Sequence, residues 1–182
     1  MKHEVSIHIG ELYASKQPAV IHTVLGSCVA ACLYDPVMQL GGMNHILLVG
    51  TSSPTAGDES ARFGINAMEQ LINKIVSLGG IRSRLQAKVF GGGHLLNLAE
   101  DKRPGTKNIK FVLDYLKTDG IEILSQNTGG SFSRKLYYHT DTFDIFMKQT
   151  LSKISGENAE TKNIPVKIEK LNSKAGEITL FD

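Results

Sequence analysis

Apolar positions in the first fifty residues recur with the spacing of strands. Two runs are dominated by β-branched and other apolar side chains, and one of them closes at the turn Asp35-Pro36. In the last run Met43, His45 and Leu47 alternate, which places them on one face of a strand. The pattern predicts strands at residues 5–9, 20–25, 29–34 and 42–49.

The middle of the chain changes to helical spacing. Residues 50–58 are turn formers and predict a loop. An apolar stripe from 60 to 78 predicts the clearest helix, which Gly79-Gly80 would end in a left-handed conformation. A second helix is expected at 106–117, with Ile109, Val112, Leu113 and Leu116 on one face.

Further apolar runs complete an α/β pattern. Strands are expected at residues 85–90, 121–125, 136–138 and 145–147, the last two as a hairpin. Strands first, then helices mixed with strands, predict a layered α/β domain with mixed sheets. After residue 151 the chain is polar with scattered apolar positions. We therefore expect one domain at 1–151 and a tail at 152–182 that is partly ordered at best.

Composition and charge restrict the class of protein. A chain of 182 residues with 41% hydrophobic and 21% charged residues suits one globular domain with a real core. The net charge of +2 argues against nucleic acid as the main partner and against an anionic membrane surface. The first ten residues do not resemble a signal peptide, and no run approaches the roughly 20 apolar residues of a membrane span. We expect no membrane insertion.

The two cysteines predict free thiols. Cys28 and Cys32 lie four residues apart on a predicted strand, where each residue adds a rise of about 3.3 Å. The resulting separation is too long for a disulfide between them. Free thiols are typical of a reducing compartment, so the sequence favours the cytoplasm. Cys32, flanked by Ala31 and Leu33, is expected in the core.

Cys28 is the strongest candidate for chemistry. Gly26 and Ser27 before it permit a sharp turn that lifts the thiol out of the sheet, and backbone N–H groups at such a turn can stabilise an oxyanion. His45 follows 17 residues later, after Gly41-Gly42, as a candidate base for the thiol. The alternative is a small buried hydrophobe, which is the commonest role of a free cysteine.

The other partners of this chemistry have structural alternatives as well. His45 would need an acceptor to orient its ring, and Thr23 is a candidate because it lies one short loop before Cys28. A histidine in an apolar strand is more often a core residue, however, and Thr23 could be an ordinary β-branched strand residue. The residues alone leave both readings open.

Metal and phosphate sites find little support. His22, His94 and His139 have no zinc-site spacing with each other or with the cysteines, so no metal or cofactor is expected. Gly91-Gly92-Gly93 follows a strand but lacks the residues of a phosphate loop. We expect these glycines to allow a close backbone approach.

Taken together, these segments resemble the CheD family of chemoreceptor glutamine deamidases. The similarity runs from about residue 9 to 147. It is carried by Thr23-Val24-Leu25-Gly26-Ser27-Cys28-Val29-Ala30-Ala31-Cys32-Leu33-Tyr34-Asp35-Pro36, Gly41-Gly42-Met43-Asn44-His45, Ala61-Arg62-Phe63-Gly64, Val89-Phe90-Gly91-Gly92-Gly93, Gly120-Ile121, Gly129-Gly130 and Arg134-Lys135-Leu136-Tyr137-Tyr138.

The resemblance implies an α/β/β/α layered, cysteine-hydrolase-like fold with a catalytic set of Cys28, His45 and Thr23. It implies hydrolysis of glutamine side-chain amides on methyl-accepting chemotaxis receptors to glutamate and ammonia, without a cofactor. It also implies the receptor's cytoplasmic helices and the phosphatase CheC as partners. The chain departs from the family pattern at Gly93-His94 and Thr142-Phe143, which we expect to alter the rim that recognises the receptor.

Two rival functions are consistent with the same residues. One is a non-catalytic regulator that binds the receptor or CheC and carries a relict site, in which case the Cys28 thiol would be unnecessary. The other is a cysteine amidase or transglutaminase-like enzyme that acts on a different protein.

Overall fold

The computed structural model describes residues 2–48, 56–94, 99, 103–151 and 178–180. Its elements in chain order are β1 (His3–Ser6), β2 (Leu12–Ser15), β3 (Ala19–Leu25), β4 (Val29–Asp35), β5 (Leu40–Asn44), α1 (Ala56–Ser77), a short 3₁₀ helix (Arg82–Arg84), β6 (Gln86–Gly91), α2 (Pro104–Thr118), β7 (Glu122–Thr128), β8 (Phe132–His139), β9 (Ile145–Leu151) and β10 (Ile178–Leu180).

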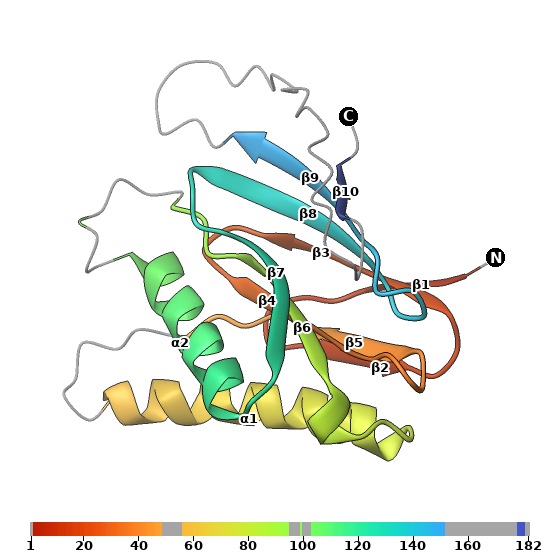
Figure 1. Ribbon diagram of the computed structural model, residues 1–182. Coiled ribbons are helices and arrows are strands. Elements are labelled where there is room, and N and C mark those ends of the chain that lie inside the picture. The colour runs from red at the N-terminus through yellow and green to blue at the C-terminus, as the bar shows by residue number, and fades with distance from the viewer. Residues whose placement is uncertain (1, 49–55, 95–98, 100–102, 152–177, 181–182) are drawn as a thin grey trace.

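The strands form two five-stranded sheets, visible one above the other in Figure 1. The outer sheet has the order β1-β3-β8-β9-β10, and the central sheet has the order β2-β5-β4-β6-β7. Both are mixed: β1 pairs with β3 and β9 with β10 in parallel, as does β6 with β7, whereas the other pairs are antiparallel. The predicted α/β domain with mixed sheets is confirmed.

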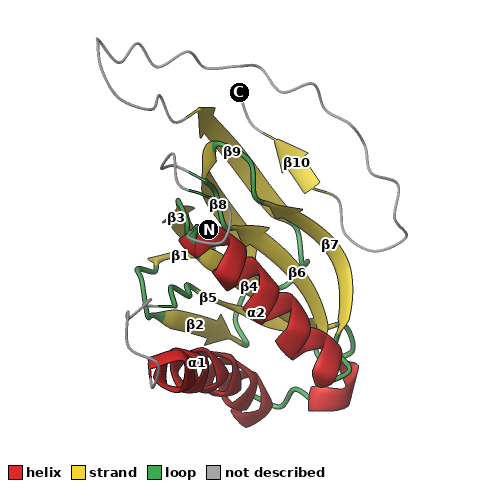
Figure 2. Ribbon diagram, turned by 90° about the vertical axis from the view of Figure 1, so that its left-hand side faces the viewer, coloured by secondary structure: helices red, strands yellow, loops and turns green. Residues whose placement is uncertain are grey.

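The central sheet is covered on both faces. Helices α1 and α2 pack on one face around a core that includes Val29, Leu71 and Val112, and the outer sheet packs on the other around Ile21, Cys32 and Phe90. Every residue of β4 is consequently buried, which explains its continuous apolar run. Figure 2 shows both helices on the same side of the two sheets. The described residues therefore form the layers α/β/β and contain no second helical layer over the outer sheet.

Most predicted elements are present with shifted ends. The first helix begins at Ala56, so the end of the expected loop belongs to α1, and the rest of that loop lies outside the described residues. The strand expected at 42–49 ends at Asn44, which leaves His45 just beyond it. Strand β2 was not predicted, because its pattern is short and half polar.

The tail expected at 152–182 lies outside the described residues except for β10, which pairs with β9. Among the described helices, neither is both long enough and apolar enough to cross a bilayer.

Candidate active site

Cys28 lies in the turn that carries the chain from one sheet to the other. Strand β3 of the outer sheet ends at Leu25, and β4 of the central sheet begins at Val29. The thiol is 7% exposed, so it is largely enclosed but not sealed in the core. Cys32, four residues on, is fully buried between the sheets, as predicted.

Three glycines at the end of β6 and just after it contact the backbone of this turn. The Gly93 N–H donates to the Gly26 carbonyl at 2.8 Å, and the Gly92 N–H donates to the Cys28 carbonyl at 2.7 Å. Gly91 adopts φ +111°, and a Cβ there would lie 2.2 Å from the Cys28 carbonyl oxygen. The predicted close backbone approach of these glycines is confirmed, and its partner is the turn that carries Cys28.

Thr23 and His45 are joined by a hydrogen bond that determines the histidine tautomer. The Thr23 hydroxyl donates its only proton to the Ile7 carbonyl at 2.8 Å. Its oxygen lies 2.8 Å from His45 Nδ1 and can therefore only accept there. The proton of the neutral imidazole is on Nδ1, and Nε2 carries a free lone pair. This is the tautomer that a general base requires.

The environment keeps both candidate reacting groups neutral. Burial lowers the pKa of His45 to about 4, so its Nε2 is unprotonated at neutral pH. Burial also raises the pKa of the Cys28 thiol, which its own backbone N–H partly offsets. Within the described residues, Nε2 has no hydrogen-bond partner. The resting site therefore holds a protonated thiol and a neutral imidazole.

Residues of β1 and β3 in the outer sheet and of the segments next to β4 and β5 line one cavity of about 610 Å³. All five residues predicted for the site line it, namely Thr23, Gly26, Ser27, Cys28 and His45. Ile9 and Val24 also line it, with exposed fractions of 56% and 60%. The cavity combines a candidate nucleophile, a candidate base and an apolar rim, which would suit an enzyme acting on a protein side chain.

The turn also presents backbone donors. Among the described residues, the N–H groups of Ser27 and Cys28 donate to no backbone carbonyl. Free N–H groups beside a nucleophile can bind the oxyanion that forms when the nucleophile attacks a carbonyl. This geometry supports the role predicted for the Gly26-Ser27 turn.

One residue that contacts the Cys28 turn, Asn108, was not predicted from the sequence. Asn108 of α2 is fully buried, and its Nδ2 donates to the Ser27 carbonyl at 2.8 Å. A signal was available, because Asn108 lies four residues before Val112 and therefore on the apolar stripe of the helix.

The expectation for Phe143 is wrong. The Phe143 side chain is 3% exposed and stacks on Tyr34, with 4.9 Å between the ring centroids. The Lys88 ammonium lies 4.4 Å from the centre of the Phe143 ring. It therefore belongs to the core between the sheets and cannot contribute to a recognition rim. His94 donates its backbone N–H to the Gly130 carbonyl and is not among the residues that line the cavity.

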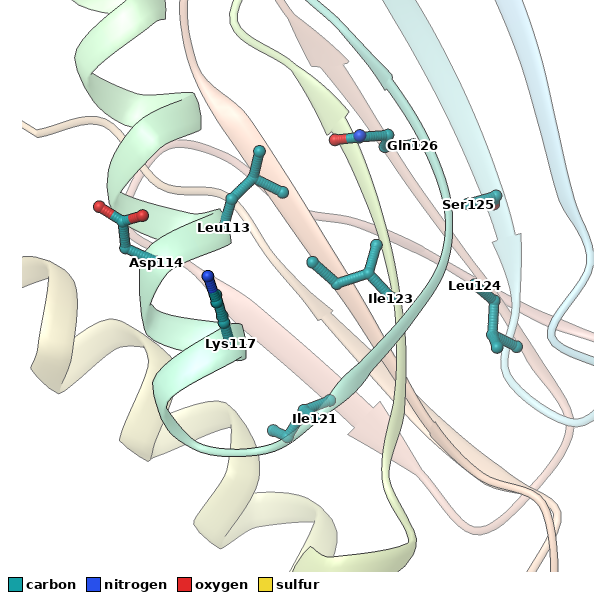
Figure 3. Close-up of a pocket in the computed structure, with 8 residues that line it drawn as sticks. All are labelled: Leu113, Asp114, Lys117, Ile121, Ile123, Leu124, Ser125 and Gln126. Atoms are coloured by element: carbon teal, nitrogen blue, oxygen red, sulfur yellow. The ribbon is translucent and has the colours of Figure 1, made fainter.

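A second groove, of about 540 Å³, lies between α2 and β7 (Figure 3). Leu113 of α2 faces Ile123 of β7 across it. Its lining includes neither a thiol nor an imidazole, so it offers no comparable chemistry. Among the described residues, no group of three His, Cys, Asp or Glu side chains is arranged to hold a metal ion.

Known proteins share sequence similarity with most of this chain. The sequence model of the CheD family, described as CheD chemotactic sensory transduction, matches residues 48–149. A probable chemoreceptor glutamine deamidase CheD 1 of Shewanella oneidensis is 46% identical over 140 residues, which cover 76% of this chain and 68% of the relative. A protein of the same description from Dechloromonas aromatica is 38% identical over 173 residues, covering 94% and 86%.

A crystal structure of the hypothetical protein YfiH of Bacillus licheniformis is similar with a TM-score of 0.44 and 16% identity, over 64% of this chain and 50% of that one. The sequence matches extend over most of this chain and of its relatives. The chain belongs to the CheD family.

Proposed function

We propose that this protein hydrolyses the side-chain amides of specific glutamines on chemoreceptors, with Cys28 as the nucleophile and His45 as its base. The observation that carries the proposal is the chain of hydrogen bonds from Ile7 through Thr23 to His45, which leaves Nε2 without a proton, together with the cavity that His45 and Cys28 both line. Membership of the CheD family, whose relatives here are named chemoreceptor glutamine deamidases, supports the substrate class.

The first half of the reaction forms a thioester. His45 Nε2 takes the Cys28 proton as Sγ attacks the amide carbon, and the carbonyl electrons move onto its oxygen. The N–H groups of Ser27 and Cys28 stabilise that oxyanion. When the oxyanion collapses, the C–N bond breaks and His45 gives its proton to the departing nitrogen, which leaves as ammonia.

The second half releases the product. His45 Nε2 removes a proton from a water molecule, whose oxygen attacks the thioester carbon to form a second oxyanion at the same N–H groups. Collapse breaks the C–S bond, and the proton returns from His45 to Cys28. The glutamine has become glutamate, and every group of the protein has returned to its starting state.

The rim suits a receptor helix. Ile9 and Val24 expose apolar side chains beside the thiol, so a glutamine flanked by apolar side chains on one face of a helix can be brought to Cys28. Because the glutamines lie on the cytoplasmic helices of the receptors, the protein acts in the cytoplasm. The phosphatase CheC is the second proposed partner, competing for the same face.

Reaction in ¹⁸O-water tests the function directly. A receptor cytoplasmic fragment is incubated with the protein, and its peptides are analysed by mass spectrometry. Hydrolysis through a thioester adds about three daltons per converted glutamine in ¹⁸O-water and about one in ordinary water. An unchanged fragment that still binds the protein would favour the non-catalytic regulator.

The acid limit of the reaction reports the state of His45. We expect kcat/KM to be nearly constant from about pH 5.5 to 8, because the His45 pKa of about 4 keeps Nε2 unprotonated throughout that range. Activity should fall as the pH approaches 4, where the imidazole becomes protonated. Ammonia release measured across this range checks the prediction, and an acid limb centred near 6.5, the ordinary histidine value, would contradict it.

Replacing Thr23 by valine tests the orienting hydrogen bond. The shape of the side chain is kept, but His45 Nδ1–H loses its acceptor, and either tautomer of the ring becomes accessible. We expect kcat to fall by about 10- to 100-fold with little change in KM, since binding at the rim is unaffected. Thr23→Ser, which keeps the hydroxyl, should restore most of the activity, and equal losses in both variants would argue against this role.

A further inference from the structure

The buried side-chain amide of Asn108, on α2, contacts the turn that carries Cys28. The buried face of this helix is formed by Gly105, Asn108, Val112 and Leu116, so Asn108 occupies a position that otherwise suits an apolar side chain. It is 0% exposed. Burying an amide is costly unless both of its polar ends are hydrogen-bonded. The hydrogen-bond partners of the two ends of the amide therefore show which parts of the structure Asn108 connects.

Both partners are backbone groups next to the proposed reacting residues. Asn108 Nδ2 donates to the Ser27 carbonyl at 2.8 Å. Asn108 Oδ1 accepts from the Leu48 N–H at 2.9 Å, three residues after His45. One side chain therefore connects the turn that carries the nucleophile with the segment that follows the base.

The close approach of α2 makes this reach possible. Gly105 lies one turn before Asn108, and a Cβ on it would lie 2.4 Å from the Gly92 carbonyl oxygen. The helix can therefore lie directly against the glycine segment behind the catalytic turn. The short side chain of Asn108 then spans the remaining gap to Ser27.

The hydrogen bond from Asn108 to the Ser27 carbonyl determines the direction in which the Cys28 N–H points. The carbonyl of Ser27 and the N–H of Cys28 belong to one peptide group, and the structure contains no cis peptide among the described residues. In a trans peptide these two groups point in opposite directions. With the carbonyl bonded to α2, the Cys28 N–H points away from the helix.

We propose that Asn108 is a positioning residue, which holds the Ser27-Cys28 peptide in the orientation that presents the Cys28 N–H to the oxyanion. The inference rests on the proposed deamidase function and adds to it a residue outside the cavity. Asn108 touches neither substrate nor thiol. It acts on transition-state stabilisation and leaves the reactivity of the thiol unchanged.

Two reactions of the same thiol separate these effects. Deamidation of the receptor fragment passes through an oxyanion, whereas alkylation of Cys28 by iodoacetamide is a displacement at carbon that forms none. Alkylation is followed on the Cys28 peptide by mass spectrometry. The variants are Asn108→Ala and Asn108→Leu, the second of which refills the space of the side chain. Val112→Ala, on the same buried face one turn later, is the control for a general loss of packing.

We expect both Asn108 variants to lose about 10- to 100-fold in kcat for deamidation, with KM and the alkylation rate within about threefold of the wild type. Val112→Ala should leave the ratio of the two rates unchanged. Wild-type kcat in either folded Asn108 variant would overturn the proposal. So would an equal fall of deamidation and alkylation, since Asn108 would then act on the thiol or on folding. A wild-type protein that leaves the fragment unconverted would instead overturn the proposed function, and the oxyanion role of Asn108 with it.

Discussion

The Cys28→Ala variant is expected to have no measurable deamidase activity, a loss of about 10⁴-fold or more. Without Sγ no thioester can form, and the His45 imidazole alone would have to activate water against an unactivated amide. The substitution removes one sulfur from a side chain that borders a cavity, so the fold should persist. Binding of the receptor fragment should also persist, because the apolar rim formed by Ile9 and Val24 is unchanged. Conversion measured by peptide mass spectrometry and binding measured by calorimetry check the two halves of this expectation.

Cys32→Ala is the matched control for that experiment. Both cysteines are free and only four residues apart, but Cys32 is fully buried between the sheets and does not line the cavity. Its loss should leave kcat unchanged and lower stability by only about 1 kcal/mol. Conversion by Cys28→Ala at a rate near that of the wild type would eliminate the thiol mechanism. If both variants were inactive, the cause would be packing between the sheets and not nucleophilic chemistry.

The His45→Ala variant is expected to lose about 10² to 10⁴-fold in kcat. The thiol pKa is raised by burial, so Cys28 has little thiolate at neutral pH and depends on a base to remove its proton. The truncated side chain leaves space beside the cavity, so added imidazole should restore part of the activity in a concentration-dependent way. Recovery should follow the fraction of neutral imidazole in solution, which increases with pH through the ordinary histidine range.

His139→Ala provides the matched histidine control. His139 lies on β8, where its ring nitrogen is 3.1 Å from Lys2 Nζ, and it does not line the cavity. Its removal should leave kcat near the wild-type value and give no response to imidazole. A His45→Ala enzyme that keeps more than about a tenth of the wild-type kcat would contradict the assignment of His45 as the base.

The neutral resting pair also has a functional consequence. A thiolate at rest would be exposed to oxidation and to alkylation by other electrophiles. Here the raised pKa keeps the Cys28 thiol protonated at rest. Burial also lowers the pKa of His45, which is why kcat/KM is expected to stay constant down to about pH 5.5.

Much of the fold could be read from hydrophobic periodicity. The buried strand β4 and the helices α1 and α2 were predicted because long apolar runs and stripes at 3.6-residue spacing have few alternative structures. Strand β2 was missed because four half-buried residues carry little periodic signal. The placement of both helices on the central sheet was also outside the reach of periodicity, since a stripe shows that a face is buried but not what buries it.

Some residues of the candidate site were likewise selected from the sequence, and one was placed wrongly. Residue types and turn chemistry, together with the family resemblance, were enough to select Cys28, the Gly26-Ser27 turn and His45 as candidates, although a buried cysteine and a core histidine remained as alternatives. Phe143 was placed wrongly at the rim, because its position departs from the family pattern in a turn and the sequence does not show which way the side chain points. Its positive φ of 63° turns the side chain back between the sheets instead.

From the sequence alone, the α/β class and the family could be predicted, and Cys28 and His45 could be selected as the candidate nucleophile and base, because these inferences depend on local patterns and on residue chemistry. Only the tertiary structure decided the tautomer of His45, the neutral state of the thiol and the contact of Asn108 with Ser27. The first depends on which carbonyl accepts the Thr23 proton, the second on how much solvent the two sheets exclude, and the third on a residue 81 positions away from Ser27. Each is a relation between segments that only folding brings together, and no spacing along the chain encodes it.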